Sequence, residues 1–287
     1  MKKLKQIIQE VKTLVAQNKP AELNAMLWQL ICYPPKMPLR LQQEQLLTEA
    51  ETFNVTVPDP YFTHKPLQVN GFKWGKGSNR VLISHGWGSK AMDFDGLITT
   101  LKEDPRLQII AFDAPANGSS EGDLSNLLLF ANAVKAVIAA TGKPDIAIGH
   151  SFGTMANVAA LCELGIKPKL LISIAPFILL QENFIRSMSA AGVPAEAQQA
   201  FLDDFKLRYG IYPSTYAMQN LYKFDDTLNH WLAYDEHDAM LPDAYLQAFL
   251  KEHPSIRTKN FRNAGHERII KSADVIRDVV EQVSGVI

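Results

Sequence analysis

Cysteine is scarce in this chain of 287 residues, and neither sign of charge is in excess. Only Cys32 and Cys162 occur, far apart and outside any CxxC or Cys/His pattern, so neither a disulfide framework nor a structural zinc site is predicted. Two unclustered cysteines are typical of a reducing compartment, and we expect a cytoplasmic protein. Lysine and arginine number 29 against 30 aspartate and glutamate residues. This balance gives no basis for binding nucleic acid or another polyanion.

Long hydrophobic runs are also missing, since no stretch approaches the ~20 apolar residues that span a bilayer. The first residues include Lys2, Lys3 and Lys5 ahead of apolar side chains, as a signal peptide does. Those apolar side chains follow helical spacing, however, with polar residues between them. The pattern therefore predicts an amphipathic helix packed on the rest of the protein. A helix that binds a membrane surface or a partner is the alternative.

What the sequence does contain is enough apolar material for one sizeable core, at 47% hydrophobic residues. Residues 1–57 are interpreted as an N-terminal helical extension, interrupted at Pro20 and again around 33–35. From residue 58 to 287, short apolar strands alternate with helices. This alternation predicts an α/β fold, with a mostly parallel sheet covered by helices on both faces. The expected strands are 61–65, 67–74, 80–84, 107–112, 145–148, 170–174, 231–234 and 257–261.

One interval breaks the alternation, at about 176–229. It is far longer than a typical connection in an α/β fold, and its content is helix-like, at 184–191, 195–209 and 215–223. An insertion at the carboxyl ends of parallel strands lies where such sheets bind ligands. We therefore expect a helical cap over the functional site.

A G-x-S-x-G motif, Gly149-His-Ser-Phe-Gly153, follows an apolar strand and precedes a helix. In this context the serine sits on a sharp strand-to-helix turn with its Oγ clear of the backbone, and the glycines remove side chains that would clash. The motif therefore predicts Ser151 as a nucleophile. The partial positive charge of the helix N-terminus would favour a developing oxyanion. A glycine-rich turn with a surface serine is the alternative.

An earlier strand ends in His85-Gly86-Trp87. We expect the backbone N–H groups of Trp87 and Phe152 to form an oxyanion hole, although His85-Gly86 as a simple strand-ending turn is the alternative. His85 itself is expected to be structural, because it lies too early for the usual order of serine, acid and histidine.

The general base and its acid are expected in the last third of the chain. His266 follows a late strand, after Gly265, and the preceding strand leads into an acidic loop with Asp235, Glu236 and Asp238. Both loops lie at the carboxyl edge of the predicted sheet, so the three groups can converge. We choose Asp238 as the acid that orients His266, and expect Asp235 to structure the turn.

Asp235, His237, Asp238 and His266 also form a set that can be interpreted as metal ligands. They lack a strict ligand spacing, so no metal and no cofactor is expected. His237 is expected to face solvent or the mouth of the pocket.

Together these motifs resemble the α/β-hydrolase superfamily. The resemblance runs from about Pro58 to the end, through HGWG at 85–88, DAPANGSSEG at 113–122, GHSFG, DEHDAMLP and AGHERII. More narrowly, the chain is similar to poorly characterised bacterial hydrolases that carry a helical segment before the core. The resemblance implies an eight-stranded, mostly parallel sheet, no cofactor, and Ser151, Asp238 and His266 as a catalytic triad.

Two positions depart from the family pattern. Relatives usually have histidine where this chain has Asn117, and often have histidine where it has Tyr234. Neither position belongs to the triad, so catalysis is still expected. The resemblance does not imply how these loops pack or what shape the pocket has. The superfamily includes esterases, thioesterases, lipases, peptidases, acyltransferases and non-enzymatic receptors, so the fold alone does not choose the substrate.

The expected function is hydrolysis of a small-molecule carboxylic ester or thioester through an acyl-enzyme. Acyl transfer to another acceptor and a non-catalytic ligand-binding or signalling role are the alternatives, and the N-terminal helices offer a partner-binding role beside either. A homo-oligomer is compatible with the sequence. Apolar residues at 177–180 and 184–185 suggest a small or medium acyl group, unless they are simply the core of the cap.

Overall fold

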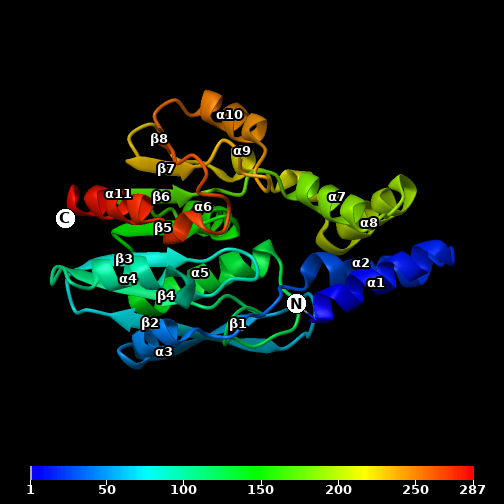
Figure 1. Ribbon diagram of the computed structural model, residues 1–287, viewed down its shortest axis with the longest axis horizontal. Coiled ribbons are helices and arrows are strands. Elements are labelled where there is room, and N and C mark those ends of the chain that lie inside the picture. The colour runs from blue at the N-terminus through cyan, green and yellow to red at the C-terminus, as the bar shows by residue number, and fades with distance from the viewer. Residues whose placement is uncertain (1) are drawn as a thin grey trace.

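A single sheet runs through the computed structural model, which describes residues 2–287 (Figure 1). Its eight strands lie in the order β1-β2-β4-β3-β5-β6-β7-β8. The strands are β1 Glu51–Pro58, β2 Pro66–Trp74, β3 Asn79–Ser84, β4 Leu107–Phe112, β5 Ile146–His150, β6 Leu170–Ile174, β7 His230–Tyr234 and β8 Arg257–Asn260. The predicted α/β fold with a mostly parallel sheet is confirmed.

Strands β3 to β8 are parallel, whereas β1 and β2 form an antiparallel pair and β2 also runs antiparallel to β4. The central strands β5 and β6 are buried along their whole length, because helices cover both of their faces. Parallel pairing brings the carboxyl ends of β3, β5, β6, β7 and β8 to one edge of the sheet.

Helices α5, α6 and α10 cover one face of the sheet and α3, α4 and α11 cover the other (Figure 1). Each face has its own buried cluster, because alternate strand residues point to opposite sides. The helices are α1 Lys2–Ala16, α2 Pro20–Cys32, α3 Leu41–Thr48, α4 Asp95–Leu101, α5 Leu127–Thr141, α6 Phe152–Glu163, α7 Leu180–Ala190, α8 Ala195–Tyr209, α9 Met218–Leu221, α10 Asp243–Glu252 and α11 Ala273–Ser284, with short 3-10 helices at Ala91–Phe94, Pro213–Thr215 and Ile269–Lys271.

The strand expected at 61–65 is wrong, because this segment is a turn. The buried carboxylate of Asp59 accepts hydrogen bonds from the N–H groups of Tyr61 and Phe62, both at 3.0 Å, and of Thr63 at 2.8 Å. An aspartate whose carboxylate accepts hydrogen bonds from the backbone N–H groups of the residues that follow it stabilises a turn rather than an extended strand.

The sheet also begins earlier than expected, since β1 lies inside the range 1–57 that the sequence assigned to a helical extension. Val55 and Val57 alternate with polar residues along β1 and point into the core, and Val57 pairs with Leu67 of β2. This alternation is the pattern of a half-buried strand. The residues before β1 form α1, α2 and α3, which agrees with the helical character that the sequence predicted.

The insertion between β6 and β7 carries α7, α8 and α9, as its sequence predicts. Helix α8 has its expected bounds, but α9 is shorter than the helix expected at 215–223. Figure 1 shows that α7 and α8 lie beside α1 and α2 rather than over a face of the sheet.

The two N-terminal helices α1 and α2 pack on the insertion through Trp28 of α2. The Trp28 ring lies 4.8 Å from that of Phe201 and is stacked at 6.0 Å on that of Phe205, both from α8. Its Nε1–H donates a hydrogen bond of 2.7 Å to Oδ2 of Asp204, which also accepts from Asn24 at 3.0 Å. Segments far apart in sequence thus form one helical layer beside the sheet.

Asp204 lies at the centre of this contact. Burial disfavours its charged form, but hydrogen bonds from Trp28, Arg208 and Asn24 outweigh the burial and lower the pKa of the carboxyl. The Arg208 guanidinium also lies 4.3 Å from the centre of the Trp28 ring, in a cation–π contact. The carboxylate is therefore held as an anion between the two segments.

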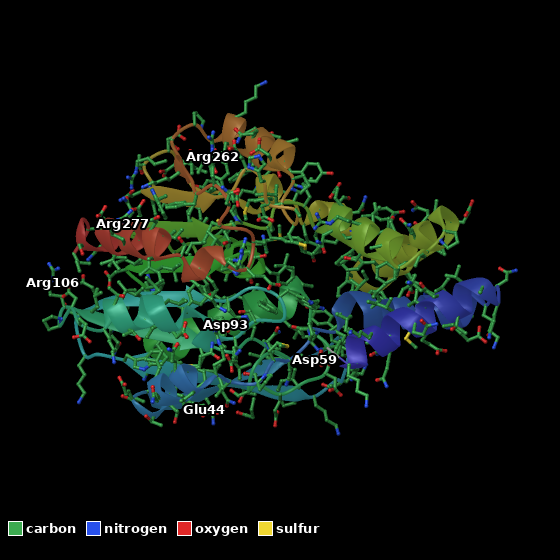
Figure 2. All side chains as sticks on the ribbon, in the orientation of Figure 1. Glu44, Asp59, Asp93, Arg106, Arg262 and Arg277 are labelled. Carbon is green, nitrogen blue, oxygen red and sulfur yellow. The ribbon has the colours of Figure 1, made fainter. Side chains whose placement is uncertain are left out.

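Charged side chains of both signs are spread over the molecule (Figure 2), and the labelled Arg106, Arg262 and Arg277 lie apart from one another. Arg106 pairs with Asp104 at 2.7 Å and Arg277 with Asp274 at 2.8 Å. Surface arginines are thus neutralised locally. Within residues 2–287, none of the helices is long and apolar enough to cross a membrane.

The packing of α2 on the insertion predicts a large cost for Trp28→Ala. Removing this buried ring leaves a cavity between α2 and α8, and Phe or Trp to Ala changes in cores typically cost about 3–5 kcal/mol. We expect a matching drop in the free energy of unfolding, measured by urea denaturation. Glu22→Ala, an exposed change on the same helix, is the control. Equal stability of the two variants would contradict the proposed packing.

Candidate active site

Ser151 occupies the turn between β5 and α6, where its φ angle is 51°. A positive φ is uncommon for a residue other than glycine, so the backbone is strained there and the surroundings must hold it. The Ser151 N–H donates to the carbonyl of Ile174 at 3.0 Å, and the Ser151 carbonyl accepts from the N–H of Phe177 at 3.1 Å. Both partners lie at or just after the end of β6, so the neighbouring strand fixes the turn.

The glycines of the motif are required by close approach of the backbone. A Cβ atom on Gly153 would lie 2.3 Å from the carbonyl oxygen of Ser84, and one on Gly149 would lie 2.6 Å from Cα of Thr154. Both distances are shorter than any real contact. The start of α6 can therefore lie against the ends of β3 and β5 only if these positions lack side chains.

The structure brings Ser151, His266 and Asp238 together in one chain of hydrogen bonds. Nε2 of His266 lies 2.8 Å from Oγ of Ser151, and Nδ1 of His266 lies 2.6 Å from Oδ2 of Asp238. Because the carboxylate accepts, Nδ1 carries the proton, and Nε2 is left to accept the hydroxyl proton of Ser151. Asp238 lies in the loop after β7 and His266 in the loop after β8, at the carboxyl edge of the sheet.

Asp238 is buried, with 5% of its surface exposed. Its second oxygen, Oδ1, accepts a hydrogen bond of 2.7 Å from the N–H of Met240. The carboxylate is therefore oriented by its own loop before it meets the imidazole of His266.

Asp235 has a different position, as the sequence predicts. Its carboxylate accepts hydrogen bonds from the N–H groups of His237 at 3.0 Å and Gly265 at 2.8 Å. Burial opposes its charge, but the N–H groups of Gly265, His237 and Asn263 prevail and lower its pKa. Asp235 thus ties the acidic loop to the loop of His266.

The other two polar residues of the acidic loop face away from the hydrogen-bonded chain. Glu236 pairs with Arg262 at 2.7 Å, and the side chain of His237 is 71% exposed. The expected solvent-facing position of His237 agrees with this exposure. Among residues 2–287, no group of three or more His, Cys, Asp and Glu side chains is placed to hold a metal ion.

His150 is a site residue that the sequence analysis missed. Its Nε2 lies 2.9 Å from the backbone carbonyl oxygen of His266. Burial, with a smaller repulsion from His266, lowers the pKa of His150 to about 3. The ring is therefore neutral, and its Nε2–H donates to that carbonyl, which holds the His266 loop against the serine turn. The only signal in the sequence is its place directly before Ser151.

Trp87 and Phe152 line the same cavity as Ser151. Trp87 follows the end of β3, and Phe152 is the first residue of α6, where N–H groups have no partner within the helix. Within residues 2–287 neither N–H donates to another protein group. Their rings pack edge to face with centres 5.3 Å apart.

His85 is structural, in agreement with the sequence. Its Nε2 accepts a hydrogen bond of 2.9 Å from the N–H of Ala114, so the proton is on Nδ1, which donates to the Gly86 carbonyl at 2.6 Å. Burial lowers the pKa of His85 and keeps the ring neutral. Asn117, at a position where relatives carry histidine, joins the same loops, because its Oδ1 accepts from the N–H of Gly88 at 2.9 Å.

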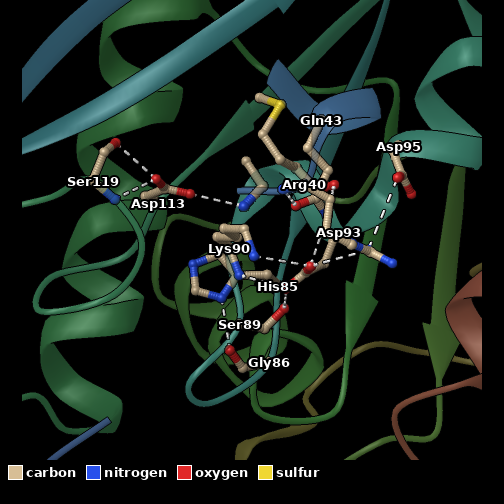
Figure 3. A network of polar contacts seen from close by, with 12 residues as sticks. Arg40, Gln43, His85, Gly86, Ser89, Lys90, Asp93, Asp95, Asp113 and Ser119 are labelled. Atoms are coloured by element: carbon tan, nitrogen blue, oxygen red, sulfur yellow. Dashed lines mark hydrogen bonds and ion pairs between the residues drawn. The ribbon is translucent and has the colours of Figure 1, made fainter. Parts of the chain in front are cut away.

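A polar network holds the loop that carries the expected oxyanion donor (Figure 3). The carboxylate of Asp113 accepts from the N–H groups of Ala91 at 2.8 Å and Ser119 at 2.7 Å. The buried ammonium group of Lys90 lies 3.2 Å from a carboxylate oxygen of Asp93. These contacts anchor the loop on its C-terminal side, while the His85 bonds anchor it at the strand.

A second serine–histidine pair occurs elsewhere in the sheet. Oγ of Ser173 lies 2.8 Å from Nε2 of His230, and the Tyr222 hydroxyl lies 3.1 Å from Nδ1 of the same ring. Burial lowers the pKa of His230 to about 3. Ser173 and His230 are both buried in β6 and β7, and neither lines a cavity among the described residues. This pair therefore belongs to the core.

A cavity of about 890 Å³ opens onto Ser151 and His266. Its walls come from the loop after β3, the insertion, the N-terminal helices, the start of α5 and the loop that carries His266. A substrate that reaches Oγ of Ser151 therefore lies between these parts.

Comparison with known proteins places the chain among hydrolases. A model described as the alpha/beta hydrolase family matches residues 81–279. No curated protein sequence matches the chain.

Solved structures resemble the fold over most of its length. An esterase from Pyrococcus furiosus has a TM-score of 0.63 and 19% identity, over 89% of this chain and 97% of its own. A thermophilic esterase from Thermogutta terrifontis has a TM-score of 0.57 and 14% identity, over 82% of this chain and 99% of its own. An epoxide hydrolase from Vigna radiata has a TM-score of 0.58 and 13% identity, over 83% of this chain and 99% of its own. At these identities the likeness concerns the fold.

The close approach at Gly153 predicts that Gly153→Ala is destabilising. The new methyl group would displace the backbone at the end of β3, and overpacking of this kind costs about 1–3 kcal/mol. We expect a lower urea midpoint. Gly285→Ala is the matched control, because its Cβ would meet its nearest atom at 3.5 Å, an ordinary contact. If Gly153→Ala lowers the urea midpoint no more than Gly285→Ala does, the turn has more room for a side chain than the structure indicates.

Proposed function

This chain belongs to the alpha/beta hydrolase family, and we propose that it is a serine hydrolase that cleaves a carboxylic ester or thioester through an acyl-enzyme. The observation that carries the proposal is the hydrogen-bonded chain from Ser151 through His266 to Asp238, with distances of 2.8 and 2.6 Å. A nucleophile, a base and an orienting acid in this geometry are what acyl transfer requires.

In the proposed reaction, Oγ of Ser151 attacks the carbonyl carbon while Nε2 of His266 takes its proton. The resulting imidazolium donates that proton to the leaving alcohol or thiol, and the bond to the leaving group breaks. Water then attacks the acyl-enzyme, with His266 again as base, and releases the acid and free Ser151. Asp238 stabilises the imidazolium and keeps the proton of the neutral ring on Nδ1.

The N–H groups of Trp87 and Phe152 are proposed to bind the oxyanion that forms during each step. A main-chain donor in such a site is worth ~2.7–4 kcal/mol in the transition state. The free state of both N–H groups and their places beside Ser151 support this assignment.

We also propose that different segments of the chain have different roles. The sheet and its covering helices carry the catalytic groups, and the insertion at about 176–229 acts as a cap together with the N-terminal helices. The contact of Trp28 with Asp204 supports a joint role for the two segments. The free thiols of Cys32 and Cys162 are consistent with the cytoplasmic location that the composition predicts.

Labelling with a fluorophosphonate probe tests the nucleophile. The probe is expected to modify the wild-type protein at Ser151, and Ser151→Ala is expected to lose both labelling and hydrolysis of p-nitrophenyl esters. The loss in kcat is expected to be about 10⁶-fold, the size found when the nucleophile of another triad is removed. Ser173→Ala is the matched control, because it breaks the buried serine–histidine pair and leaves Ser151 intact.

Loss of labelling in Ser173→Ala alone would refute the assignment of the nucleophile. Failure of the wild-type protein to react at all would instead favour a binding protein of the same fold. Added alcohol that diverts the product to a new ester would show acyl transfer in place of hydrolysis.

The assignment of the acid is tested by Asp238→Asn. An amide at this position donates to His266 where the carboxylate accepts, which favours the wrong tautomer, so we expect kcat to fall by about 10⁴-fold. Asp235→Asn keeps an acceptor oxygen for the N–H groups of the loop, so its kcat is expected to fall much less than that of Asp238→Asn. Steady-state kinetics with a p-nitrophenyl ester compares the two variants. A silent Asp238→Asn beside a damaging Asp235→Asn would reverse the assignment.

A further inference from the structure

We infer that the substrates are esters or thioesters of long-chain acids, and that the N-terminal helix α1 forms part of the wall against which the acyl chain packs. The inference rests on the proposed function and adds to it a substrate class. It starts from the cavity that opens onto Ser151.

The cavity is large and has two chemically different ends. Its volume of about 890 Å³ is near the upper end of the ~300–1,000 Å³ typical of small-molecule sites. All of its charged lining residues come from outside α1, α2 and the insertion. These charged residues are Arg40, Lys90, Asp93, Glu267 and Lys271. The end formed by the helices is uncharged.

The uncharged end is built mainly from aliphatic and aromatic side chains of both segments. These include Leu4, Ile8, Leu30, Ile31, Leu180 and Phe184. Two polar groups on this wall satisfy each other, because the amide of Asn126 donates to the hydroxyl of Tyr209 at 3.0 Å. Ser125, Asn183 and Ser187 add further uncharged polar groups. Burial raises the pKa of the Cys32 thiol in the same wall to about 12, so the thiol is neutral. This wall is uncharged and mainly apolar, so it favours the acyl chain over the leaving group.

Leu4 and Ile8 show that part of this wall has no protein partner. Both face the cavity from successive turns of α1. Ile7, Val11 and Leu14, on the neighbouring stripe of the same helix, are buried. Leu4 and Ile8 are only half-buried and are absent from the groups packed on the core. An acyl chain that extends from Ser151 along the cavity would cover them.

The size of the cavity selects against short acyl groups. An acetyl group bound at Ser151 would touch only the walls beside the serine, and the apolar surface of α1 and α2 would stay in water. Each further methylene that enters the cavity is expected to improve binding about fourfold if it is fully buried. Selectivity should therefore increase with chain length until the cavity is filled.

The test compares p-nitrophenyl butyrate with p-nitrophenyl decanoate, and butyryl-CoA with decanoyl-CoA. In the wild-type protein, kcat/KM is expected to be at least about tenfold higher for the ten-carbon acyl group than for the four-carbon one. In Ile8→Trp, the indole occupies the far part of the cavity, and the ratio of the two values is expected to fall at least about fivefold.

Gln9→Trp is the matched control, since it places the same ring on an exposed position of the same helix and is expected to keep the wild-type ratio. Should Ile8→Trp fail to fold by circular dichroism, Leu4→Phe makes the same test. A wild-type ratio near or below one, or equal ratios in Ile8→Trp and Gln9→Trp, would overturn the inference.

Failure of this inference is distinguishable from failure of the proposed function. Cleavage of butyrate and labelling of Ser151 without a preference for decanoate would overturn only the long-chain substrate. Absence of both labelling and cleavage would overturn the serine hydrolase itself.

Discussion

The turn between β5 and α6 is the constraint on which the rest of the site depends. Ser151 holds a backbone conformation that typically costs about 1–3 kcal/mol, so neighbouring groups must enforce it. A Cβ on Gly86 would lie only 3.2 Å from Cβ of Ser151, so the loop after β3 touches the turn directly. The end of β6 bonds the same turn through the Ile174 carbonyl. The position of the hydroxyl is thus fixed by the ends of the two neighbouring strands, β3 and β6, rather than by its own loop.

The loop that carries the His266 imidazole is also fixed by hydrogen bonds at two points. The Asp235 carboxylate fixes the backbone at Gly265, just before the histidine, and the neutral ring of His150 holds the carbonyl of His266 itself. Because His150 directly precedes Ser151, the base loop is tied to the nucleophile turn by a group that takes no part in proton transfer. Parallel pairing made this convergence available, since it brings the ends of β5, β7 and β8 to one edge.

Local patterns predicted the sheet and selected the residues of the candidate site, because each motif is a strand end with its adjoining loop. Ser151, His266 and Asp238 could be chosen from such segments, and the order of the strands then brought them together. Three features were missed, because their local signals are weak. The polar residues of β1 concealed a half-buried strand, Asp59 converted an expected strand into a turn, and His150 acts on a backbone carbonyl that no side-chain pattern marks.

The contact between the N-terminal helices and the insertion was also beyond sequence reasoning, and it joins two segments that line the cavity. Trp28 and Asp204 are joined by a hydrogen bond of 2.7 Å, although Trp28 precedes the first strand in the chain and Asp204 lies between β6 and β7. The same helices line the uncharged end of the cavity. Moving either segment alone would expose the Trp28 ring and leave the Asp204 carboxylate short of donors. The contact therefore ties together the two segments, far apart in the chain, that form this wall of the cavity.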